Sequence, residues 1–131
     1  MSVSFLMYLL GRPGLRWQSP LPEALAGIVA QVNAEPAAPW DNPKLAREAH
    51  MSIDGFIRTF RRWMNTTPAR YVAQVRIREA CRLLVETEET IDEIAARLGF
   101  PDRFYFTRVF KRLTGLPPVR YRREHAPGAP G

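Results

Sequence analysis

The sequence has few of the residues that bind metals or form disulfides. Its 131 residues include one cysteine, Cys81, and two histidines, His50 and His125, which lie far apart. A single cysteine excludes an internal disulfide, and two distant histidines have no metal-ligand spacing. We therefore expect no metal site, no cofactor and a reducing, cytoplasmic setting.

Long hydrophobic runs and catalytic motifs are also missing. The longest apolar run, Val3 to Leu10, is far shorter than the ~18 residues of a membrane span. It has neither a basic flank nor an A-x-A-like cleavage site, so it does not read as a signal peptide. The sequence contains no P-loop, no nucleophile-elbow pattern and no paired histidine and carboxylate. We expect no catalytic residues, no enzyme activity and no membrane partner.

Positive charge, by contrast, is abundant. The sequence has 19 Lys and Arg against 13 Asp and Glu, a net charge of +6, and 17 of the cations are arginine. Many lie in two patches, 58–70 and 103–123, with the acidic stretch 86–93 between them. This separation of sign favours an anionic partner. The acidic stretch is either a solvated loop and helix start or a contact surface for another protein.

The two basic patches belong to an internal repeat. "FIRTFRRWMNTTPARY" (Phe56 to Tyr71) aligns with "FTRVFKRLTGLPPVRY" (Phe106 to Tyr121) at a spacing of 50 residues. Upstream, "LAREAHMS" (Leu45 to Ser52) aligns with "IAARLGFP" (Ile94 to Pro101) at a spacing of 49 residues. Two copies are too few for a solenoid and indicate a pair of similar small subdomains.

Each copy predicts a helix, a tight turn and a second helix. In the second copy, Thr90 followed by Glu93 is typical of a capping box, and Gly99 suits a left-handed turn. In the first copy, Ser52 is the expected cap, and His50 occupies the place of Gly99. Histidine tolerates positive φ better than most residues. The second helices are expected at about 53–64 and 102–114.

The predicted fold is therefore all-α, with two helix-turn-helix subdomains joined by a long central helix and about seven helices in total. The expected segments are an N-terminal apolar segment at 1–20, a helix and linker at 21–39, the first helix-turn-helix at 40–67, the connecting helix at 68–86, the second helix-turn-helix at 87–125 and a disordered tail at 126–131.

Helical periodicity explains why aromatics and cations interleave so closely. Large apolar residues share one face of each second helix, namely Phe56, Phe60 and Trp63 in one and Phe106, Phe110 and Leu113 in the other. The opposite faces carry Asp54, Ile57, Arg58 and Arg61 in one and Phe104, Thr107, Arg108 and Lys111 in the other. A connecting helix of roughly 28 Å nearly matches the ~34 Å between successive major grooves of DNA.

At these residues the sequence resembles the DNA-binding domain of AraC/XylS-type bacterial transcription regulators. The resemblance covers roughly 40–123 and rests on "LAREAHMS…F.R.F", the two-copy spacing and "I.EIA..LGF.D…F.R.FKR..G..P..YR". It implies seven helices and binding to double-stranded promoter DNA, usually with activation of transcription and RNA polymerase as a partner. The base-contacting residues it implies are Asp54, Ile57, Arg58, Arg103, Phe104, Thr107 and Arg108. The expected phosphate contacts are Ser52, Arg61, Arg62, Lys111, Arg112 and Arg120.

Two residues depart from the family pattern. Phe104 stands where the family often has a small polar residue, and Asp54 places an acid beside DNA phosphates. Both departures leave the target sequence open.

Most family members also carry a sensor or dimerisation domain, and only about 40 residues precede the resemblance here. The segment 1–20 is then either a remnant of such a domain, in a fragment or a protein started at an internal Met, or part of a short stand-alone regulator. We expect no small-molecule effector within this chain, and a monomer or weak dimer.

Two other functions compete with DNA binding. A truncated family fragment could serve as a helical protein-interaction module without DNA binding. An RNA binder is the second alternative, but RNA recognition usually uses sheet aromatics or single-strand clamps, and the sequence predicts no strands.

Overall fold

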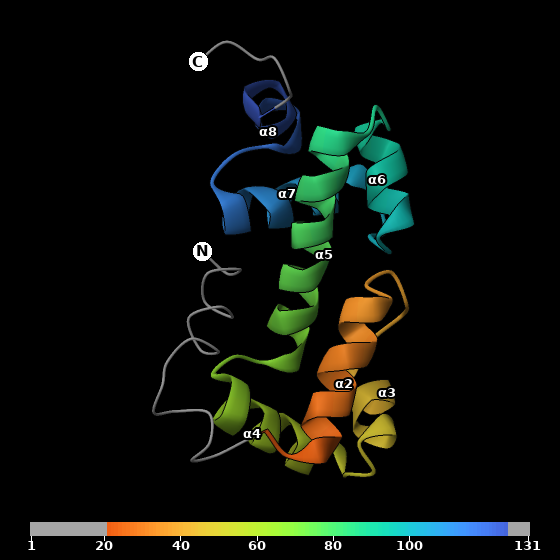
Figure 1. The fold of residues 1–131 in the computed structure, drawn as a ribbon, viewed down its shortest axis with the longest axis vertical. Helices are drawn as coiled ribbons and strands as arrows, with labels where there is room; N and C mark the ends of the chain where they lie inside the picture. The colour runs from red at the N-terminus through yellow and green to blue at the C-terminus, as the bar shows by residue number, and fades with distance from the viewer. Residues whose placement is uncertain (1–20, 126–131) are drawn as a thin grey trace.

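The computed structural model describes residues 21–125, which form seven helices and no strand (Figure 1). The expectations for 1–20 and 126–131 lie outside the described residues. The prediction of an all-α fold with two helix-turn-helix units on a long helix is confirmed. The helices are α2 (Glu23–Ala34), α3 (Asn42–Glu48), α4 (Ile53–Met64), α5 (Pro68–Glu86), α6 (Ile91–Arg97), α7 (Arg103–Thr114) and α8 (Pro118–His125).

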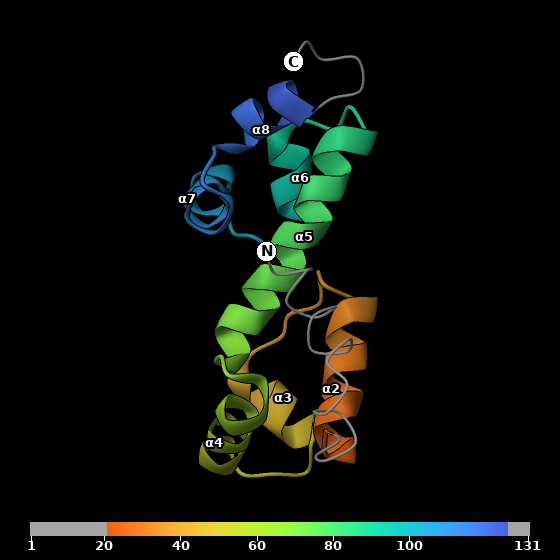
Figure 2. The same cartoon turned by 60° about the vertical axis from the view of Figure 1, so that its left-hand side comes forward.

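The long helix α5 is the spine of the molecule. Its 19 residues run along the long axis, with α2, α3 and α4 around its first half and α6, α7 and α8 around its second half (Figures 1 and 2). Its bounds coincide with those expected for the connecting helix. A separate helix after the Pro117–Pro118 pair was not predicted from the sequence. The repeat includes this helix, because α8 begins at Pro118 and its counterpart α5 begins 50 residues earlier, at Pro68.

Each half of α5 contributes to its own hydrophobic core. Tyr71, Val72 and Val75 belong to the first core, and Ile77 begins the second, so the division falls at Arg76. The first core also contains Leu25, Ile28, Val32, Leu45, Ala46, Ala49, Phe56, Phe60 and Met64. The second also contains Ala80, Leu83, Leu84, Ile94, Ala95, Leu98, Phe100, Phe106, Val109 and Phe110. Two separate cores make two subdomains that share one helix.

Short polar side chains fix where the helices begin. The Ser52 hydroxyl accepts from the Gly55 N–H at 3.1 Å, as predicted. The predicted capping box is also present, with Glu93 N–H donating to Thr90 Oγ1 at 3.0 Å and Thr90 N–H to Glu93 Oε1 at 2.8 Å. Asp102 caps α7 through the Tyr105 N–H at 2.8 Å, so that helix begins one residue later than expected.

The repeat also governs the turns. His50 and Gly99 both adopt positive φ, 61° and 85°, between the two helices of their units, as the alignment predicted. The second helices end in the same way, with Asn65 at φ 60° and Gly115 at φ 90°. Residues without a β-branch fill all four positions, because a left-handed conformation crowds Cβ against the carbonyl.

Two arginines act as structural clamps. Arg76 donates to the carbonyl oxygens of Pro36 at 2.8 Å and Ala38 at 2.7 Å, which ties the linker after α2 to the middle of α5. Burial lowers the pKa of Arg76. Arg122 donates to the Leu84 and Thr87 carbonyls at 2.9 and 3.2 Å. Arg122 therefore has a structural role, although it lies within the basic patch 103–123.

No helix within residues 21–125 has the length and apolar character to cross a membrane. Over the same residues, no three histidine, cysteine or acidic side chains come together as a metal-binding group.

Candidate nucleic-acid interface

The second helix of each unit, α4 or α7, is the candidate recognition helix. Both lie on the same side of the molecule, with α4 beside the start of α5 and α7 beside its second half (Figure 2). Each follows a short helix and a positive-φ turn, so the two are presented by equivalent local structures. The centres of the buried faces are also equivalent, with Phe56 and Phe60 in α4 matched by Phe106 and Phe110 in α7. Met64 and Val109 are also buried, but their counterparts in the repeat are half-buried.

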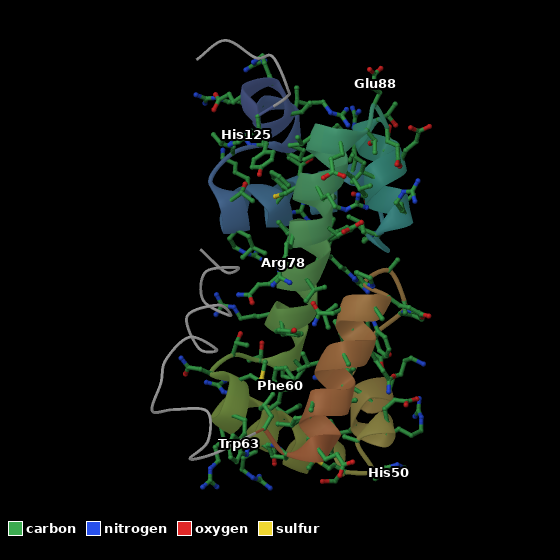
Figure 3. The ribbon with its side chains drawn as sticks, in the orientation of Figure 1. His50, Phe60, Trp63, Arg78, Glu88 and His125 are labelled. Atoms are coloured by element: carbon green, nitrogen blue, oxygen red, sulfur yellow. The ribbon has the colours of Figure 1, made fainter. Side chains whose placement is uncertain are left out.

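Aromatic contacts hold these helices in place. The rings of Phe56 and Phe60 lie 5.6 Å apart, and those of Phe106 and Phe110 also lie 5.6 Å apart. Figure 3 shows Phe60 where α4 meets the first turns of α5, and Trp63 further out on α4. Trp63 is only half-buried, so it covers the edge of the first core and is not part of its centre.

The structure brings the predicted base-contacting residues to the outer faces of the two helices. In α4, Asp54 and Arg58 are exposed, whereas Ile57 is half-buried and packs against the first core. In α7, Thr107 is half-buried, and the other three residues are exposed. These three are Arg103, Phe104 and Arg108.

The predicted phosphate-contacting residues surround these faces. All six are exposed, namely Ser52, Arg61, Arg62, Lys111, Arg112 and Arg120. The Ser52 hydroxyl already accepts a hydrogen bond as a cap, and its proton remains free to donate. Arg120 differs from the other cations because its Nε lies 2.7 Å from Glu124 Oε2. A phosphate would have to compete with this carboxylate.

Most cations on the outer faces of the recognition helices are not engaged in salt bridges with other described residues, so these faces remain positively charged. Among the described residues, salt bridges engage Arg82, Arg97, Arg103 and Arg120. Arg58 and Arg108 make none within residues 21–125, nor do Arg61, Arg62, Lys111 and Arg112. Unpaired exposed cations suit an anionic polymer, since they need not lose an internal partner on binding.

The first turn of α7 contains a cluster that sequence reasoning missed in part. Arg103 lies 3.8 Å from Asp92 and 5.3 Å from the Phe104 ring centre. The Arg108 guanidinium lies 5.5 Å from the centre of the Tyr105 ring. Tyr105 is 43% exposed and was not among the predicted site residues. Its place three residues before Arg108 is the signal that could have identified it, because such residues are neighbours on a helix.

A groove of about 290 Å³ separates α7 from the first half of α5. Arg70, Arg76 and Arg112 supply its charge, and Trp40 and Tyr105 are among its aromatic walls. Arg70 was also missed, although the repeat makes it the counterpart of Arg120. Arg70 and Arg112 therefore lie on opposite walls of this groove, one from α5 and one from α7.

The acidic stretch has a partly structural role. Glu89 binds Arg97 with 2.9 Å between Oε2 and Nη2, Glu86 binds Arg82 at 2.9 Å, and Glu93 completes the capping box. The expected helix start is therefore present. Glu88 is exposed at the loop between α5 and α6 and points away from the helices (Figure 3).

The family model and the relatives that match this chain all describe helix-turn-helix proteins or transcriptional regulators. A family model described as "Helix-turn-helix domain" matches residues 45–124. The regulator AlkR of Acinetobacter baylyi is 32% identical over 76% of this chain and 33% of its own length. The regulator Rv1931c of Mycobacterium tuberculosis is 40% identical over 63% of this chain and 32% of its own length. The chain thus spans about a third of the curated relatives it matches.

Solved structures agree with this grouping. The DNA-binding domain of AdpA, crystallised with a target DNA, is 32% identical with a TM-score of 0.74, over 77% of this chain and 91% of that domain. An AraC-type regulator from Chromobacterium violaceum shares the fold at 23% identity, with a TM-score of 0.73 over 82% of this chain and 95% of that one.

Proposed function

Because this chain belongs to the helix-turn-helix family of AraC/XylS-type transcription regulators, we propose that it binds double-stranded promoter DNA sequence-specifically and regulates transcription. The observation that carries the proposal is the matched placement of Arg58 and Arg108. These arginines lie 50 residues apart in the repeat, exposed and unpaired within residues 21–125, on helices that face the same side. One chain thus presents two equivalent recognition helices.

The spacing of these helices suits two successive major grooves. The 19 residues of α5 make a rod of about 28 Å, against ~34 Å between successive major grooves on one DNA face. A single chain then places α4 in one groove and α7 in the next. Dimerisation is not needed to reach both.

The exposed side chains divide into two roles. Arg58 and Arg108 are suited to guanine O6 and N7, and the rest of the base-contacting set reads neighbouring base edges. The cations one turn further on, such as Arg62 and Arg112, are suited to phosphates, which fix position without reading sequence. Arg70 joins them because it lines the groove between α5 and α7.

The regulatory step we propose is activation through contact with RNA polymerase, without a small-molecule effector in this chain. Transcription in vitro from a promoter containing the bound site tests it. Addition of the protein should raise transcript yield. Unchanged or lower yield with the site occupied would contradict activation and leave DNA binding intact.

Selection of bound duplexes from a random pool tests the DNA-binding proposal itself. The selected site should then show affinity that falls with salt, at a log–log slope of about −5 to −7 for ~6–8 phosphate contacts. Arg82→Ala is the matched control, because Arg82 is exposed on α5 and already paired with Glu79 and Glu86. It should leave affinity nearly unchanged.

Failure to select or bind any duplex would overturn the proposal. The chain would then be better explained as a helical protein-interaction module, the alternative left open by the sequence.

A further inference from the structure

Phe104 is the most exposed large hydrophobic residue in the described part of the chain. Its side chain is 66% exposed, whereas Phe56, Phe60, Phe106 and Phe110 are at most 1% exposed. At ~100° per residue, Phe104 lies almost opposite the buried face of α7 and within about 40° of Arg108. It is therefore at the centre of the outer face of a recognition helix.

The residue in the same position of the first unit has a different chemistry. Asp54 is the counterpart of Phe104 in the repeat, and it is also exposed in the first turn of its helix. Arg58 and Arg108, by contrast, are identical. The two helices thus offer the same arginine beside an acid in one case and an apolar ring in the other.

Major-groove chemistry limits what an exposed phenylalanine can recognise. The groove displays hydrogen-bonding atoms on every base pair, and its apolar group is the C5-methyl of thymine. A phenyl ring cannot satisfy the donors or acceptors of the other edges, so contact with them leaves polar atoms unpaired. Contact with the methyl group removes apolar surface of both partners from water.

We propose that Phe104 determines specificity by packing against the C5-methyl group of a thymine, next to the guanine read by Arg108. This inference rests on the proposed DNA binding. It makes the recognised site asymmetric, because Asp54 can instead accept from a cytosine amino group in the other groove. The protein therefore binds its site in one orientation.

Replacement of single thymines by deoxyuridine in the selected duplex tests the inference, because only the methyl group is removed. Affinity should fall about fourfold at one thymine of the α7 half-site, the value of one buried methyl group. The same thymine can also be replaced by cytosine or by 5-methylcytosine, each opposite guanine. The 5-methylcytosine duplex should bind more tightly than the cytosine duplex, because it regains the methyl group. Replacement of thymines outside that half-site by deoxyuridine should leave affinity unchanged.

Two protein variants complete the test. Phe104→Ser should bind thymine and deoxyuridine duplexes equally, whereas Phe104→Leu should keep the preference because it remains apolar. Val119→Ala, at an exposed hydrophobic residue outside both recognition helices, is the control and should leave the preference unchanged.

The two hypotheses fail in different ways. If no duplex binds, the proposed function is wrong. If the wild-type protein binds but no deoxyuridine substitution weakens it, the role of Phe104 is wrong. The role of Phe104 would also be wrong if Phe104→Ser still preferred the thymine duplex over the deoxyuridine duplex as strongly as the wild-type protein does.

Discussion

The Phe110 and Tyr121 rings meet edge to face, with centroids 5.4 Å apart and planes at 83°. The counterpart pair in the first unit, Phe60 and Tyr71, has centroids 5.7 Å apart and planes at 63°. In both units this contact attaches the recognition helix to the helix that follows it. The two units therefore share this aromatic packing between helices as well as their sequence pattern.

Removing one of these rings should loosen a single unit. Phe110 is fully buried, so Phe110→Ala should lower the free energy of unfolding of the second unit by about 3–5 kcal/mol. Chemical denaturation followed by circular dichroism measures this loss. Val119→Ala, at an exposed site, is the control. A loss below about 1 kcal/mol for Phe110→Ala would contradict the docking role.

The matched turns allow a paired prediction. Gly99 has φ 85°, and a Cβ there would lie 3.0 Å from the Ala37 carbonyl oxygen, so Gly99→Ala should destabilise the fold by at least ~1 kcal/mol. His50→Gly should instead stabilise it by up to ~1 kcal/mol, because His50 has φ 61°. Thermal unfolding of both variants measures the shifts. Shifts of the same sign would contradict the equivalence of the two turns.

Ionisation of Tyr121 should make stability depend on alkaline pH. Burial raises the pKa of Tyr121 to about 12 from an ordinary 10.0, and the adjacent Cys81 thiol adds to the shift. Between these values the unfolded chain loses the proton while the folded chain keeps it. The stabilisation is thus complete below pH ~10 and is lost as pH rises toward ~12.

Denaturation of wild-type protein and Tyr121→Phe across this pH range measures the effect. The free energy of unfolding should fall less steeply with pH in Tyr121→Phe. Parallel curves would show that the hydroxyl has no shifted pKa.

Contacts with bases and phosphates should respond differently to mutation. Arg58→Ala and Arg108→Ala should each cost about 1–3 kcal/mol of binding and relax preference at one base pair. Arg112→Ala should weaken all sequences alike. Binding to a library of single-position site variants separates the two outcomes. Uniform weakening by Arg108→Ala would show that it contacts the backbone only.

The connecting helix should set the distance between the two contacts. Gln74→Pro would break α5 near the end of its first-core segment, at ~3 kcal/mol or more. The second unit should stay folded, because the buried residues that α5 contributes to the second core begin at Ile77. The footprint on DNA should then shrink from about two helical turns to one. Gln74→Ala is the control, and an unchanged footprint in Gln74→Pro would mean that α5 does not set the spacing.

The sequence predicted the parts of the fold that depend on local chemistry. The capping roles of Ser52 and Thr90 and the turn at Gly99 could be predicted because caps and left-handed turns favour few residue types. The buried faces of α4 and α7 followed from the helical period. The repeat also placed His50 in a positive-φ turn, as the counterpart of Gly99.

The roles of individual arginines were harder to predict. Arg76 and Arg122 bind backbone carbonyls, whereas Arg58 and Arg108 face outward. Helical periodicity placed Arg58 and Arg108 opposite the apolar faces of their helices, but no local pattern predicted the carbonyl contacts of Arg76 and Arg122. Which arginine finds an unpaired carbonyl depends on distant segments such as the linker at 36–38. The identity of each base contact depends on a partner that the sequence does not contain.

Guanine methylation interference on the selected duplex is the most direct test of whether Arg58 and Arg108 read guanines in two successive major grooves, because N7 methylation blocks arginine contacts there. Two interfering guanines are expected about one helical turn apart on one DNA face, in a complex of one chain per duplex. Arg58→Ala should abolish interference at one guanine and Arg108→Ala at the other. A single interfering position, or two that both depend on the same arginine, would contradict the placement of α4 and α7 in successive grooves.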